Sequence, residues 1–136
     1  MALTALGVDV VLHDPSRITL LLARDLGAGR LAQDGDDVAL VVVAAPPDVT
    51  PDVVIAELEA HPGAVVTDVA SVKVAVLEAL TTSGADLTRY VGSHPMAGSE
   101  RTGPTAARPD LFVGRPWVVV PSRLTGGEAV RLVRDL

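Results

Sequence analysis

The sequence contains no cysteine, a single lysine, and only one residue each of tryptophan, tyrosine and phenylalanine. Without cysteine the chain has no disulfide, no thiolate metal ligand and no cysteine nucleophile. A net charge of −6 and the lack of a basic stripe argue against a nucleic-acid surface. No run approaches the ~18 uninterrupted apolar residues of a membrane-spanning helix, and no basic segment opens a signal peptide. These absences predict a cytoplasmic protein with neither a nucleic-acid nor a membrane partner.

The residues that are present suit a single globular domain. The 136 residues are 49% hydrophobic and 21% charged, so the chain can bury a core and is not disordered. The apolar residues are mostly alanine, valine and leucine, and they fall into short runs separated by proline and glycine. We find no internal repeat and no low-complexity segment.

Apolar runs typical of strands alternate with segments of helical periodicity. Strands are predicted over 8–14, 37–48, 64–71, 88–93 and 115–122, and helices over 16–29, 50–63, 71–84 and from 125 onward. The run at 37–48 is nearly unbroken, as in strands that a parallel sheet buries on both faces. The alternation predicts an α/β fold of the Rossmann type, with an open, mostly parallel sheet and helices on both faces.

Polar or turn-forming residues lie at the carboxyl ends of four predicted strands. They are Asp14, Ala45 with Pro46, the segment 68–71, and His94. Open α/β sheets bind their ligands beyond the carboxyl ends of the strands, so this shared placement predicts a ligand site.

Asp14 can accept hydrogen bonds from both hydroxyls of an adenosine ribose, which would favour NAD over NADP. The alternative is that Asp14 caps the helix at 16–29. The phosphate-binding fingerprint G-x-G-x-x-G is absent from the chain. The opening "ALTALGVDVVLHD" looks like a last helical turn, Gly7 and the second strand of a Rossmann unit. We therefore expect the first strand and the glycine loop to lie upstream of Met1.

Three further side chains are candidates for the site. An imidazole exchanges a proton near neutral pH, so His94 suits the oxidation of an alcohol, with a structural histidine as the alternative. Ser71 is expected to cap the following helix and can also face the ligand. Lys73 is interpreted as a solvated surface charge. No histidine or carboxylate pair has ligand spacing, so we expect no metal site.

The string "GSHPMAGSERTG" at 92–103, preceded by "DVASVK" at 68–73 and "VVVAAPP" at 41–47, resembles the prephenate/arogenate dehydrogenases. The resemblance covers the whole chain and implies that 1–136 is an incomplete NAD-binding domain, without the family's helical C-terminal dimerisation domain. It implies an NAD-dependent oxidative decarboxylation of prephenate, or of arogenate, in tyrosine biosynthesis by a homodimeric parent protein; NADP is the less favoured cofactor. The alternatives are an inactive cofactor-binding remnant and a related hydroxy-acid dehydrogenase.

The same resemblance implies roles for individual residues. His94 matches the catalytic histidine that binds the ring hydroxyl and takes its proton. Ser71 matches the serine that orients this histidine near the nicotinamide. Asp14 matches the ribose-binding carboxylate, and residues 45–46 match the loop along the cofactor. Glu100 matches an acidic position near the substrate, with a surface role as the alternative.

The expected missing strand has a consequence for the chain by itself. In the common strand order 3-2-1-4-5-6 it lies between the runs at 8–13 and 37–44. Both neighbours would then expose an unpaired edge, and the pyrophosphate would lack its backbone donors. We expect the isolated chain to be poorly soluble or loosely packed and to show no dehydrogenase activity.

Overall fold

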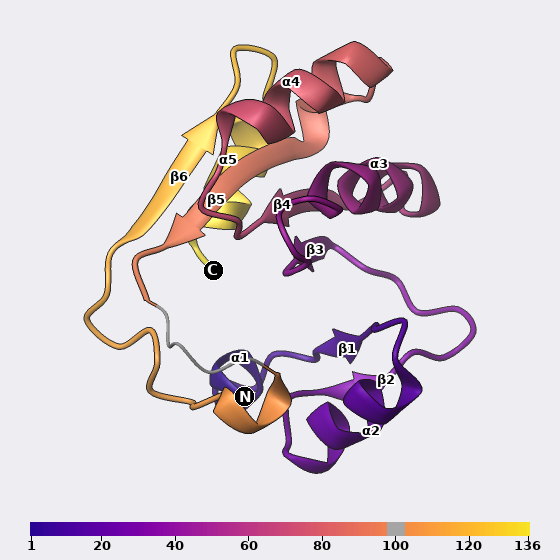
Figure 1. Cartoon of the computed structure of the whole chain (residues 1–136), viewed down its shortest axis with the longest axis vertical. Helices are drawn as coiled ribbons and strands as arrows, with labels where there is room; N and C mark the ends of the chain where they lie inside the picture. Colours follow the sequence, from indigo (N-terminus) through magenta and orange to yellow (C-terminus); the bar gives the residue numbers. More distant parts are fainter. Residues whose placement is uncertain (98–102) are drawn as a thin grey trace. The chain divides into compact units, whose positions relative to one another are not determined.

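The computed structural model describes residues 1–97 and 103–136, which form two compact units (Figure 1). Unit 1 comprises Met1–Asp36 and Met96–Pro116, and unit 2 comprises Asp37–Pro95 and Trp117–Leu136. Each unit has a sheet of its own, and each is described by itself.

Unit 2 is built on a four-stranded sheet of order β3-β4-β5-β6. Its elements are β3 (Leu40–Val43), α3 (Thr50–Ala60), β4 (Val65–Asp68), α4 (Val74–Ser83), the 3₁₀ turn η1 (Leu87–Arg89), β5 (Tyr90–Pro95), β6 (Trp117–Pro121) and α5 (Gly127–Arg134). Strands β3, β4 and β5 are parallel, and β6 runs antiparallel to β5. The prediction of an open, mostly parallel α/β sheet is confirmed.

Helices cover both faces of this sheet because successive side chains of a strand point to opposite sides. On β4, Val66 packs in a core with α3 and α4, whereas Val65 packs against the core of α5. On β5, Tyr90 packs in the first of these cores and Val91 in the second. The buried residues of the first core are Val43, Val54, Leu58, Val66, Val76, Leu80, Leu87 and Tyr90, and those of the second are Val91, Ala129 and Val133.

Helix α4 begins later than the sequence indicates. It ends as expected at Gly84, whose φ of 75° is the left-handed conformation that glycine adopts readily. Its N-cap is Lys73 and has no side-chain capping hydrogen bond, so the expectation that Ser71 caps this helix is wrong. The cause is a local competitor: Asp68 Oδ1 accepts from the backbone N–H of Ala70 at 3.0 Å, which favours a turn over a helix.

Unit 1 contains a two-stranded parallel sheet. Its elements are α1 (Ala2–Ala5), β1 (Val11–Leu12), α2 (Arg17–Asp25), β2 (Arg30–Leu31) and the 3₁₀ turn η2 (Pro104–Ala106). The sequence analysis missed β2, because two residues are too few to show a period of two. Gly29 permits this pairing, since a Cβ there would lie 2.4 Å from the carbonyl oxygen of Val10. Arg30 supports it with ion pairs to Asp9 and Asp36 at 2.9 and 2.7 Å.

The strand order is compatible with the expected Rossmann numbering. Within unit 1, β1 pairs with β2, as strands 2 and 3 do in the order 3-2-1-4-5-6; within unit 2, β3, β4 and β5 are neighbours in sequence order, as strands 4, 5 and 6 are. Within the described residues, β3 is an edge strand of its sheet. A central strand and a glycine loop upstream of Met1 stay predictions.

Arg89 closes the carboxyl end of α3. Its guanidinium donates to the carbonyl oxygens of Leu58 at 2.8 Å, His61 at 3.0 Å and Ala64 at 2.9 Å, and to Asp86 at 3.1 Å. Leu58 lies in the last turn of α3, where the carbonyls have no partner within the helix. Arg89 therefore pairs a helix acceptor and also binds two carbonyls of the segment that follows the helix.

We expect Arg89→Met, which keeps the apolar stem, to lower the free energy of unfolding by about 2–3 kcal/mol, because hydrogen bonds from a charged donor are lost. Urea denaturation measures this change. Arg134→Met on the exposed last turn of α5 is the control, with an expected loss below about 0.5 kcal/mol. Equal losses in the two variants would contradict the assigned role.

Candidate functional site

His94 lies on a part of β5 that extends beyond β4. The last residue pair between β4 and β5 is Asp68 with Gly92, whereas β6 stays paired with β5 through His94 and Pro95. The half-buried His94 is therefore held in the sheet by β6 at the point where β4 has ended. Its imidazole stands at the edge where parallel α/β sheets bind their ligands.

Ser93 attaches this extension of β5 to the end of β4. Its Oγ accepts a hydrogen bond from Thr67 Oγ1 at 3.0 Å and donates one to the carbonyl oxygen of Asp68 at 3.0 Å. All three residues are fully buried. Because side chains alternate along a strand, burying Ser93 directs His94 to the opposite face of the sheet.

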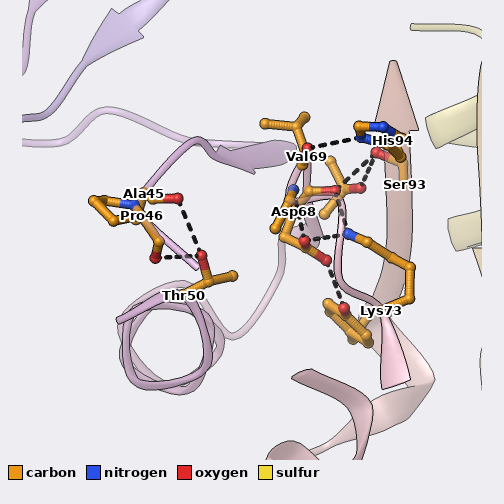
Figure 2. Close-up of polar contacts among 11 residues, drawn as sticks. Ala45, Pro46, Thr50, Asp68, Val69, Lys73, Ser93 and His94 are labelled. Carbon is orange, nitrogen blue, oxygen red and sulfur yellow. Dashed lines mark hydrogen bonds and ion pairs between the residues drawn. The ribbon is translucent and has the colours of Figure 1, made fainter. Parts of the chain in front are cut away.

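The imidazole of His94 contacts a backbone carbonyl. Its Nδ1 lies 3.3 Å from the oxygen of Val69, in the turn after β4 (Figure 2). A carbonyl oxygen only accepts hydrogen bonds, so this contact requires a proton on Nδ1. In the neutral ring, Nε2 is then the basic nitrogen, as general-base chemistry requires. Ser71 is exposed, and no hydrogen bond within the described residues joins it to His94.

A buried ionic cluster lies beside this turn (Figure 2). Asp68 is fully buried; its Oδ1 pairs with Lys73 Nζ, and its Oδ2 accepts from Tyr90 Oη at 2.6 Å. Burial and the adjacent carboxylate raise the pKa of Tyr90. Burial lowers the pKa of Lys73, and Asp68 offsets part of that effect. The side chain of Lys73 is 16% exposed, so its interpretation as a solvated surface charge is wrong.

Gly92 makes room for this cluster. It lies between Tyr90 and His94 on the same face of β5, and a Cβ there would be 3.2 Å from Lys73 Cδ and 3.3 Å from Tyr90 Oη. The chain's one lysine and one tyrosine both belong to the cluster. The single occurrence of each residue type is the sequence signal that could have drawn attention to this cluster.

The turn at Ala45 and Pro46 follows β3 and leads into α3. Both carbonyl oxygens accept from the buried hydroxyl of Thr50, at 3.1 and 2.9 Å (Figure 2). These carbonyl acceptors are engaged by the start of α3. The alanine and proline side chains of the turn are apolar, so apolar contact is what they can offer a ligand. This turn, residues 68–71 and His94 all lie at the carboxyl ends of parallel strands in unit 2.

Asp14 belongs to unit 1, where it follows β1 and borders a hollow of about 280 Å³. The hollow is lined mainly by apolar residues of β1, α2 and residues 103–107. Ser16, and not Asp14, is the N-cap of α2, because its Oγ accepts from the N–H of Thr19 at 3.3 Å. Asp14 Oδ1 accepts from the N–H of Ser16 at 2.8 Å. A carboxylate has further acceptor sites, so Asp14 can also bind a ligand hydroxyl.

The remaining candidate features are Glu100, a metal site and a membrane-spanning helix. Glu100 lies outside the described residues, so its expected role near the substrate stays a prediction. Within 1–97 and 103–136, no group of three His, Asp or Glu side chains is arranged to hold a metal ion. In the same ranges no helix has the length and apolar character needed to cross a membrane.

The parallel sheet with helices on both faces, and with polar residues where its strands end, defines a Rossmann-like nucleotide-binding domain. Residues 2–136 match the family model for the nucleotide-binding domain of prephenate dehydrogenase. The chain belongs to the prephenate dehydrogenase family, which confirms the resemblance seen in its sequence.

Individual relatives agree with this assignment. The probable prephenate dehydrogenase NovF of Streptomyces niveus is 40% identical over 136 residues, which are all of this chain and 37% of that protein. Arogenate dehydrogenase of Synechocystis superposes with a TM-score of 0.83 at 25% identity, over 98% of this chain and 49% of that one. Prephenate dehydrogenase of Aquifex aeolicus, in complex with hydroxyphenyl propionate and NAD⁺, shares the fold with a TM-score of 0.83 at 23% identity and the same coverage, 98% and 49%. The chain thus spans between 37% and 49% of the length of these relatives.

The hydroxyl of Tyr90 is expected to resist ionisation in the folded protein. Its pKa is raised above the ordinary value near 10, so folding stability is intact below pH 10 and falls as the pH rises above it, where the unfolded chain loses this proton and the folded chain keeps it. Phenolate absorbance near 295 nm of the full-length protein, after subtraction of the same signal from Tyr90→Phe, reports Tyr90, the one tyrosine of these 136 residues.

We therefore expect phenolate absorbance above pH 10 to appear together with unfolding, followed by circular dichroism. Tyr90→Phe is the control, which supplies the subtracted signal and lacks this part of the alkaline loss of stability. Ionisation of a fully folded protein with a midpoint near 10 would show that the Tyr90–Asp68 contact is wrong.

Proposed function

We propose that this chain is the nucleotide-binding part of a prephenate dehydrogenase, which uses NAD⁺ to convert prephenate into 4-hydroxyphenylpyruvate in tyrosine biosynthesis. The observation that carries the proposal is the imidazole of His94, placed beyond the end of β4 with its Nδ1 on the carbonyl of Val69. The 40% identity to NovF over the whole chain supports it.

The residues of the chain fit NAD⁺ in their chemistry. Asp14 supplies an anionic acceptor for the ribose hydroxyls at the edge of a mainly apolar hollow in unit 1. Residues 45–46 offer apolar contact in unit 2. The A. aeolicus relative was solved with NAD⁺ bound. Since the sequence has no G-x-G-x-x-G segment, we assign the pyrophosphate donors to a stretch of the parent protein upstream of Met1.

In the proposed reaction, Nε2 of His94 accepts the proton of the ring hydroxyl as the carbon that bears it is oxidised. The carbonyl of Val69 keeps its hydrogen bond to Nδ1 and so stabilises the imidazolium that forms. When bound, NAD⁺ would be the acceptor of the hydride from that carbon. Loss of CO₂ makes the ring aromatic, and the proton held by His94 returns to the phenolic oxygen. The exposed Ser71, in the turn after β4, is assigned a place near the nicotinamide.

Arogenate is the second candidate substrate, and the superposition on the Synechocystis arogenate dehydrogenase favours it. The two substrates differ in a keto or an amino group on the side chain, which we assign to contacts with the rest of the parent protein. There we also place the surface of a homodimer, and we assign the enzyme to the cytoplasm. Assaying both substrates with the full-length protein decides between them.

In the full-length protein, His94→Asn keeps a hydrogen-bonding group and removes the base. We expect turnover to fall by roughly 10²–10⁴-fold, with much smaller changes in the affinities for substrate and NAD⁺. Steady-state NADH formation measures this. His61→Asn, at the C-cap of α3, is the matched control and should leave turnover near that of the wild type. Turnover near that of the wild type in His94→Asn would show that His94 is not the catalytic base.

Cofactor preference tests Asp14. A carboxylate at the ribose repels the 2′-phosphate of NADP⁺, so we expect NAD⁺ to be preferred and Asp14→Ser to narrow that preference. The ratio of kcat/KM for the two cofactors is the measurement, and Asp34→Ser on the exposed surface of unit 1 is the control. A wild-type enzyme with a higher kcat/KM for NADP⁺ than for NAD⁺ would show that Asp14 does not bind the ribose and only forms the turn with Ser16.

A further inference from the structure

The carboxylate of Asp68 holds one side of the peptide unit whose other side contacts His94. Its Oδ1 accepts from the N–H of Ala70 at 3.0 Å. That N–H and the carbonyl of Val69 belong to the same planar trans peptide, so they point in opposite directions. Fixing the N–H therefore aims the carbonyl of Val69, and this oxygen lies 3.3 Å from Nδ1 of His94.

The carboxylate is itself fixed from several directions. Lys73 Nζ pairs with Oδ1 and Tyr90 Oη donates to Oδ2, while the main-chain carbonyl of Asp68 accepts from Ser93 Oγ. On the far side, the N–H of Val69 donates to the carbonyl of Val43 at 3.1 Å. The turn after β4 is thus held in one orientation although it belongs to no helix or strand.

Turning this peptide over would exchange the roles of the two ring nitrogens of His94. With the unit turned over, the N–H of Ala70 would face Nδ1, which would then have to accept a hydrogen bond. The proton of the neutral ring would move to Nε2, and the nitrogen assigned as the base would be blocked.

We propose that Asp68 is the positioning residue for His94. Through the peptide between Val69 and Ala70 it keeps the ring proton on Nδ1 and leaves Nε2 basic. The importance of this tautomer for turnover rests on the proposed function, whereas the tautomer itself does not. Ser71 does not set it, although the resemblance to the family implies that this serine orients the histidine.

The tautomer is read by NMR of the full-length protein labelled with ¹⁵N in its histidines, at a pH where the rings are neutral. The signals of His94 are those that His94→Asn removes. We expect Nδ1 at a pyrrole-type and Nε2 at a pyridine-type shift. Asp68→Ala should lose this pattern, with Nδ1 moving toward the pyridine-type position. Asp68→Asn should restore it, because the amide oxygen can still accept from Ala70.

Two matched variants separate positioning from general damage to the cluster. Tyr90→Phe removes a partner of Oδ2 and leaves Oδ1 on Ala70, so the wild-type tautomer should persist. Ser71→Ala should keep it as well. Because Asp68→Ala leaves the charge of Lys73 buried and unpaired, Asp68→Ala with Lys73→Met is recorded beside it.

The wild-type tautomer in a cooperatively melting Asp68→Ala/Lys73→Met variant would overturn the proposal. So would its loss in Ser71→Ala. The assay of His94→Asn is independent of these spectra: full turnover there, with the tautomer pattern as expected, would refute the proposed function and leave the positioning role of Asp68 standing.

Discussion

A carboxylate at the fully buried end of β4 is costly unless its oxygens are paired, and Asp68 meets that requirement by drawing groups from three parts of unit 2. Lys73 comes from the start of α4, Tyr90 from β5, and the N–H of Ala70 from the turn between β4 and α4. The late start of α4 and the glycine at position 92 follow from the space and the hydrogen bonds that this arrangement needs. The same carboxylate that stabilises the sheet therefore orients the turn next to His94.

The second support of His94 is an antiparallel strand. Parallel pairing with β4 stops at Gly92, and β6 continues the ladder to Pro95. An imidazole on an unpaired strand end would lack this backbone support. Pairing with β6 gives it the rigidity of a sheet at the point where β4 has ended, and a rigid element is the support that a proposed base needs.

Features with a local cause were predictable from the sequence, and features with a distant cause were not. The nearly unbroken apolar run at 37–48 indicated a parallel strand, and Gly84 marked the end of α4. The expected burial of that strand on both faces is not found, since Val42 is exposed within the described residues. The string around His94 indicated both the family and a histidine at a strand end. Strand β2 escaped detection because its two residues pair only through the approach allowed at Gly29. Lys73 was misread because the burial of its side chain depends on β5, where Gly92 leaves room for it.

The path of the chain between the two units bears on how the protein is made. The polypeptide passes from one unit to the other after Asp36, after Pro95 and after Pro116, so neither unit is a continuous piece of sequence. During synthesis, the first unit cannot acquire η2 until residues 104–106 have left the ribosome. Strand β5 must wait still longer, for β6 and for the α5 residues that cover Val91. Until then the nascent chain exposes the edge of β5, with His94 on it, so the stretch that begins the family's sequence motif is among the last to be protected from misassembly.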